Sequence, residues 1–124
     1  DGSLATAEVR PAVRRHPATG ELVWCNQAHL FHVSNLDAAS QAELLHHTDE
    51  HRLPRHAWLG DGAAIDVDDL RTIRAAYAAE QVAHAWEPGD VLVVDNLLVA
   101  HGRRPYTGER SVVVAMTGTV DDRP

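Results

Sequence analysis

The fold is decided by one stretch, Trp86-Glu87-Pro88-Gly89-Asp90-Val91-Leu92-Val93-Val94-Asp95-Asn96, followed by Ala100-His101-Gly102-Arg103. Four apolar residues after a Pro-Gly-Asp turn predict a buried strand at 91–94, and residues 97–100 and 111–117 predict two more. Arg110 lies nine positions after His101 and begins the last of these strands, so both side chains are expected to face the same interior from neighbouring strands. Histidine suits a metal ion and arginine suits a carboxylate, so the stretch predicts half of a site for a metal and an oxoacid.

The residues before this stretch predict one hairpin and two helices. Residues 9–15 and 22–25 are expected to be strands, because proline and glycine in the segment between them favour a turn. Asp37 is expected to cap a helix over residues 38–46 that ends near Thr48 and buries Leu44 and Leu45. Residues 49–62 are mostly polar and predict an irregular loop.

A clearer helix is expected to start at Asp66 and to close within residues 79–83, because Leu70, Ile73 and Tyr77 form one apolar stripe. Strands paired through turns and interrupted by surface helices fit an antiparallel jelly roll better than alternating strand-helix units. The sequence therefore predicts a mainly β fold with surface helices.

Three blocks of sequence carry a resemblance to a known family. They are residues 14–21 running into 23–32, the triplet Gly60-Asp61-Gly62, and residues 88–103. From about Val9 to Met116 the chain resembles the C-terminal half of the taurine dioxygenase and clavaminate synthase-like superfamily of iron(II)/2-oxoglutarate oxygenases. In pattern it looks closest to the hydroxylases of peptide natural-product pathways. The resemblance implies a double-stranded β-helix, which is a jelly roll.

The resemblance also implies roles for two residues. The equivalent of His101 is the second histidine ligand of iron(II), and the arginine matched by Arg110 holds the distal carboxylate of 2-oxoglutarate. The family's other histidine and its carboxylate ligand form a His-x-Asp/Glu motif far upstream, and this sequence begins too late to contain that motif. Residues 1–124 are therefore expected to be the C-terminal part of a single oxygenase domain, with a missing N-terminal half or a partner chain supplying the other ligands.

His47-Thr48-Asp49 also satisfies the pattern His-x-Asp, but we interpret it as unrelated to the iron site. It lies only 54 positions before His101, on a polar loop, and no strand precedes it. Together with His46, His51 and His56 it predicts a histidine-rich surface loop that can bind zinc or nickel adventitiously.

Three further residues are candidate substrate contacts. Asn26 and Gln27 are expected either to point toward substrate at the barrel mouth or to form a hydrogen-bonded barrel edge. Arg103 is expected either to neutralise a substrate carboxylate or to face solvent. Asp95 and Asn96 are expected first to be turn residues, and the alternative for Asn96 is to orient a metal ligand.

Composition excludes several classes of function. A net charge of -7 and a pI near 5.6 argue against a nucleic-acid partner. All 11 basic residues are arginine, which excludes lysine nucleophiles and Schiff-base chemistry. The single cysteine, Cys25, cannot form an internal disulfide, which fits a reducing cytoplasm. No apolar run approaches the roughly 20 residues of a membrane helix, so no membrane association is expected.

The sequence therefore predicts an iron(II)/2-oxoglutarate-dependent oxygenase that hydroxylates an unactivated C–H bond of a free or carrier-tethered amino acid in a biosynthetic pathway. Desaturation would use the same metal site, and the sequence does not separate the two outcomes. The rival interpretation is a non-catalytic jelly-roll binding module or a degenerate oxygenase half, and the absence of the His-x-Asp/Glu motif is its main support.

Overall fold

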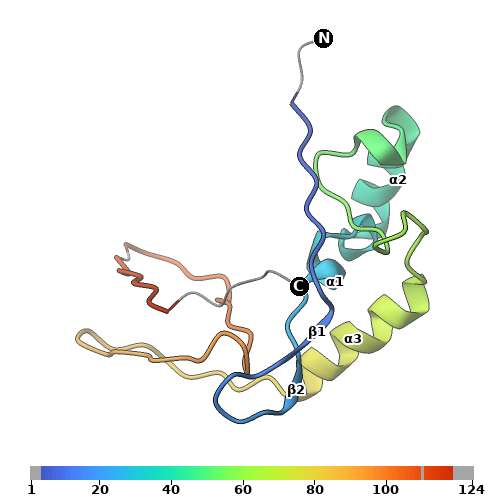
Figure 1. Cartoon of the computed structure of the whole chain (residues 1–124). Coiled ribbons are helices and arrows are strands. Elements are labelled where there is room, and N and C mark those ends of the chain that lie inside the picture. The colour runs from blue at the N-terminus through green and yellow to red at the C-terminus, as the bar shows by residue number, and fades with distance from the viewer. Residues whose placement is uncertain (1–3, 110, 119–124) are drawn as a thin grey trace.

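The structure is a computed structural model, and it describes residues 4–109 and 111–118. In chain order its elements are strands β1 (Val13–Arg15) and β2 (Leu22–Trp24), helix α1 (Ala28–Phe31), 3-10 helix η1 (Val33–Asn35), helix α2 (Ala38–His47), 3-10 helix η2 (Glu50–Arg52) and helix α3 (Val67–Ala79). Figure 1 shows the helices gathered on one side of the hairpin, whereas the chain after α3 extends to the other side without regular structure.

The β1–β2 hairpin confirms the first predicted pair of strands in shorter form. The two strands are antiparallel, with Val13 opposite Trp24 and Arg15 opposite Leu22. Gly20 has a φ of 75°, which glycine adopts without steric cost, and its N–H donates to the carbonyl of His16 at 2.9 Å. The turn therefore holds His16 at the end of β1.

Both long helices begin where the sequence predicts. The Asp37 side chain accepts the backbone N–H groups of residues 39 and 40 at the start of α2, and the Asp66 side chain accepts that of residue 68 at the start of α3. The expected burial of Leu44 and Leu45 is wrong, because α2 has no buried residue: Leu44 is half-buried and Leu45 is 40% exposed. Within the described ranges, no helix is long and apolar enough to cross a membrane.

The core lies where α1 and η1 meet α3. Leu70 of α3 is 1% exposed and Val33 of η1 is also buried. Arg74 of α3 donates through Nε and Nη2 to the carbonyl oxygen of His29 at 3.0 and 2.8 Å, and the His29 ring stacks on Tyr77 with 4.6 Å between ring centroids. A small apolar centre is therefore reinforced by polar contacts between α1 and α3.

The predicted strands at 91–94, 97–100 and 111–117 are not strands in this structure. A strand needs a neighbour that completes its backbone hydrogen bonds, and the only paired strands among the described residues are β1 and β2. Most apolar side chains of these segments are consequently exposed, Val91 by 86% and Val113 by 92%, whereas Val94 and Leu97 are half-buried. The expected mainly β fold is therefore not seen among the described residues, which carry several helices and one two-stranded sheet but lie mostly outside regular structure. The double-stranded β-helix remains an expectation for this chain.

Candidate functional site

A pocket of about 220 Å³ lies between the hairpin, α3 and the turn that precedes His101. It is lined by residues 24–27, by Tyr77 of α3 and by residues 96–101. Three residues predicted from the sequence, His101, Asn26 and Gln27, thus line one cavity although 74 positions separate Gln27 from His101. The pocket is smaller than the ~300–1,000 Å³ typical of small-molecule sites.

Asn26 is already engaged with the backbone. Its Oδ1 accepts the N–H of Ala28 at 2.7 Å, and its Nδ2 donates to the carbonyl of Pro11 at 3.3 Å. These bonds fix the start of α1 against the chain before β1, which favours the hydrogen-bonded edge over a free substrate contact. Gln27 is exposed at the pocket wall. A substrate role for either residue stays a prediction.

Neither Arg103 nor the neighbouring Arg104 is among the residues that line this pocket. Arg103 is exposed, and its guanidinium lies 5.2 Å from the ring centroid of Tyr106. Arg104 donates to Oε1 of Gln81 at 3.2 Å. Arg110 lies outside the described residues, so its predicted role remains a prediction.

Asp95 organises the turn that leads to His101, as its predicted turn role requires. Its Oδ1 accepts the N–H of Leu97 at 2.9 Å, and its carbonyl accepts those of Leu98 and Val99 at 3.1 and 3.0 Å. Its Oδ2 is 2.9 Å from Nε2 of His16 in the hairpin. The Leu97 N–H, followed by the His16 hydrogen bond, lowers the pKa of the Asp95 carboxyl, so this side chain is an anion at neutral pH.

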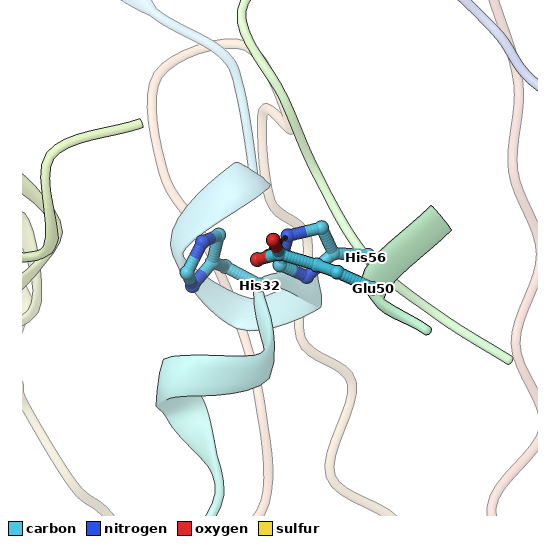
Figure 2. Close-up of side chains that lie close together, drawn as sticks. All are labelled: His32, Glu50 and His56. Atoms are coloured by element: carbon cyan, nitrogen blue, oxygen red, sulfur yellow. Dashed lines mark ion pairs between the residues drawn. The ribbon is translucent and has the colours of Figure 1, made fainter. Parts of the chain in front are cut away.

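A second cluster is formed by His32, Glu50 and His56 (Figure 2), and none of the three lines that pocket. One candidate ligand atom from each residue lies within 4.8 Å of the others, and His56 Nε2 is 3.1 Å from Glu50 Oε1. Sequence analysis places His56 on a surface loop, which is wrong because its side chain is only 2% exposed. His32 is buried as well.

The hydrogen bonds of this His32–Glu50–His56 cluster do not favour a metal ion. Nδ1 of His32 accepts the N–H of Ser34 at 3.1 Å, and Nδ1 of His56 accepts the N–H of Val33 at 3.2 Å. A neutral imidazole that accepts at Nδ1 carries its proton on Nε2, the atom that His56 turns toward Glu50. Binding a metal at Nε2 would move that proton to Nδ1, against a backbone donor. Through His56, the cluster therefore connects Glu50 of η2 to the backbone of Val33 in η1.

Buried histidines make stability dependent on pH. Burial lowers the pKa of His29 and His32, and it lowers the pKa of His56 although Glu50 partly opposes the shift. The unfolded chain, with histidine pKa values near 6.5, binds protons that the folded chain does not. The free energy of unfolding is thus expected to be highest above about pH 6.5, the histidine pKa in the unfolded chain. It should decline as the pH falls from there toward the lower pKa values of the folded chain.

Thermal unfolding from about pH 7.5 to about pH 5.5 tests this expectation. The melting temperature should fall by several degrees, and His56→Gln should reduce the fall because it removes one titrating group while leaving an amide donor for Glu50. His84→Ala, at an exposed position, should keep the full dependence. A melting temperature that rises toward acid would contradict the assignment.

His47 and Asp49 do not form a metal site in the described structure. His47 is the last residue of α2, and the Asp49 side chain accepts the N–H of His51 at 2.9 Å. Among the residues that the structure describes, the group of three metal-ligating side chains includes neither of them, nor His101. The described chain thus offers a single imidazole to the pocket.

Comparisons with known proteins agree with the resemblance seen in the sequence. Residues 1–117 match the family described as taurine catabolism dioxygenase TauD, TfdA family. The chain is 43% identical over 120 residues to the dapdiamide synthesis protein DdaC of Enterobacter agglomerans, and 36% identical over 69 residues to a clavaminate synthase-like protein of Arabidopsis thaliana. These matches cover 97% and 55% of this chain but only 36% and 21% of the two relatives. No solved structure matches the chain significantly.

Proposed function

Because the chain belongs to the taurine catabolism dioxygenase TauD, TfdA family, we propose that it forms the part of an iron(II)/2-oxoglutarate-dependent oxygenase that supplies His101 to the metal and Arg110 to the oxoacid. The observation that carries the proposal is the pocket, in which His101 meets the hairpin residues of another family-like block of sequence. The comparisons establish an oxygenase-type family, and the cofactors, the reaction and the two residue roles are our proposal.

The fit to iron(II) rests on the donor set. A non-haem iron(II) site of this kind uses two imidazoles and one carboxylate and keeps open positions for other ligands. His101 is exposed at the pocket and offers one imidazole. No group of three ligands within the described ranges includes His101, so we propose that the other histidine and the carboxylate come from a further segment of a longer protein or from a partner chain.

Iron(II), when bound, supplies the redox chemistry by which dioxygen gives one oxygen atom to a C–H bond and the other to succinate while 2-oxoglutarate loses carbon dioxide. The residues of this chain bind and orient. Arg110 would hold the distal carboxylate of the oxoacid through two parallel charge-assisted hydrogen bonds. Trp24, Leu97 and Val99 contribute apolar side chains to the pocket wall, beside the polar groups of Asn26 and His101.

The proposed substrate is a free or carrier-tethered amino acid in a natural-product pathway. DdaC, by its name, takes part in dapdiamide synthesis, and this chain matches it over 97% of its length. Arg103 would neutralise the carboxylate of a free amino acid, a group that a carrier-tethered substrate lacks. The Arg103→Ala variant would therefore separate the two substrate classes.

The deciding experiment uses the complete product of the gene that contains this sequence. It is mixed without oxygen with iron(II) and 2-oxoglutarate, and the visible metal-to-oxoacid charge-transfer band is measured. The band should appear in the wild type and be absent from His101→Ala. A folded wild-type protein without the band would favour the rival interpretation, a non-catalytic binding module.

Replacing Arg110 by alanine should raise the KM for 2-oxoglutarate by about 10- to 100-fold, because a charge-assisted pair contributes roughly 1.5–3 kcal/mol. The kcat at saturating 2-oxoglutarate should change much less. Arg104→Ala is the matched control, since Arg104 donates to Gln81 and should leave KM unchanged. An unchanged KM in Arg110→Ala would mean that another residue binds the distal carboxylate of 2-oxoglutarate.

A further inference from the structure

We propose that His16 and Asp95 form a positioning pair that fixes the turn carrying His101 relative to the hairpin wall of the pocket. This inference rests on the proposed function, since it concerns the placement of the proposed iron ligand. Neither residue lines the pocket or is assigned a ligand role. The two residues are 79 positions apart in the sequence, and their side chains are joined by a hydrogen bond.

The hairpin fixes the His16 ring from one side. His16 is 5% exposed at the end of β1, and its Nδ1 accepts the backbone N–H groups of Ala18 and Thr19 at 3.3 and 3.1 Å. An imidazole that accepts at Nδ1 presents a proton at Nε2. That proton points to Asp95 Oδ2 at 2.9 Å, so the hairpin turn orients a donor at the start of the 95–101 segment.

Asp95 connects the His16 side chain to the residues that form the pocket wall. While its Oδ2 accepts from His16, its Oδ1 and its carbonyl hold the N–H groups of Leu97, Leu98 and Val99. All three of these residues line the pocket, and His101 follows two positions after Val99. One carboxylate thereby connects the buried hairpin histidine to the turn that ends at the proposed ligand.

Such a connection has a functional reason beyond stability. A metal ligand must be held within about 0.5 Å of its productive position, by packing and by supporting hydrogen bonds from neighbouring groups. His101 is exposed and lies on coil, since residues 97–101 are not a strand. The pair therefore supplies positional support that regular secondary structure does not provide here.

Two substitutions of His16 separate positioning from folding. In His16→Asn the side-chain oxygen takes the place of Nδ1, so the bonds from Ala18 and Thr19 are kept and the bond to Asp95 is lost. In His16→Gln the amide nitrogen takes the place of Nε2, so the donor to Asp95 is kept and the hairpin bonds are lost. Each variant thus removes one set of the His16 hydrogen bonds and keeps the other.

In the complete gene product, His16→Asn should raise the iron(II) concentration that half-saturates the charge-transfer band by up to about 10-fold, the lower end of the effect of losing a group that hydrogen-bonds directly to a metal ligand. The effect is smaller because His16 acts on His101 through Asp95 and the turn that follows it. His16→Gln should stay close to the wild type. The melting temperature of both variants is measured in parallel. The inference would be overturned if the two variants lowered iron affinity equally and in proportion to their losses in melting temperature, because His16 would then have only a structural role.

A second measurement needs no iron. Amide NMR resonances of Leu97, Leu98 and Val99 should shift more in His16→Asn than in His16→Gln, whereas those of Ala18 and Thr19 should shift more in His16→Gln. Unchanged resonances at 97–99 in His16→Asn overturn the inference whether or not the wild type forms the band. Absence of the band in the wild type overturns the proposed function instead, so the two failures are distinguishable.

Discussion

Replacing His101 by alanine is expected to reduce 2-oxoglutarate-dependent turnover by more than about 100-fold. Groups that only hydrogen-bond to a metal ligand contribute about 10- to 100-fold, and loss of the ligand itself should exceed that effect. His101 is the one imidazole that lines the pocket in the described chain, so no described residue there can replace it. The measurement is succinate formed per enzyme under saturating iron(II), 2-oxoglutarate and oxygen.

The matched control is His84→Ala. His84 lies in the same coil region, is exposed, and has its ring 5.1 Å from that of Trp86. It is not among the residues that line the pocket, so its loss should leave turnover within a few-fold of the wild type. Turnover in His101→Ala that matches the control, with the fold verified by circular dichroism, would remove His101 from the iron site.

The second large effect is on stability. Leu70→Ala should lower the free energy of unfolding by roughly 2–5 kcal/mol, because it combines lost apolar burial with a cavity that few neighbours can fill. Leu70 is 1% exposed and belongs to the helix whose Arg74 also binds the carbonyl of His29. Urea denaturation followed by circular dichroism measures the loss.

Leu45→Ala serves as its control. Leu45 is 40% exposed on α2, so the same chemical change should cost no more than about 1 kcal/mol. Similar losses in the two variants would mean that Leu70 is not the centre of the core. In that case the contact between α1 and α3 would not be what stabilises the helical part.

Local signals in the sequence predicted local structure. Asp37 and Asp66 start helices as expected because each carboxylate satisfies backbone N–H groups only two or three residues ahead. The Pro88-Gly89 turn is also present, with a hydrogen bond from the N–H of Asp90 to the carbonyl of Glu87 at 3.1 Å. The prediction of a strand at residues 91–94 was wrong. An apolar run indicates only that a segment favours β structure, whereas a strand also needs a neighbouring strand to pair with.

Sequence analysis named some of the residues that the pocket brings together, while their functional roles stay predictions. The pocket brings His101 together with Asn26 and Gln27, which sequence analysis singled out separately. The His16–Asp95 pair and the His32–Glu50–His56 cluster were missed, because each joins residues that only folding brings together. One signal was available for the first, since a histidine beside the Pro17 turn and an aspartate after an apolar run both stand at the ends of expected strands.

The exposed valines after α3 have a consequence for handling the protein. Val91-Leu92-Val93-Val94 and Val112-Val113-Val114 combine high β-propensity with no proline and no charge, and in the described structure their backbones lack a strand partner. Such segments in neighbouring molecules can pair with one another and stack into cross-β aggregates. Preparations of this polypeptide by itself will thus tend to precipitate at high concentration, and a charged residue introduced at Val93 or Val113 would act as a gatekeeper against it.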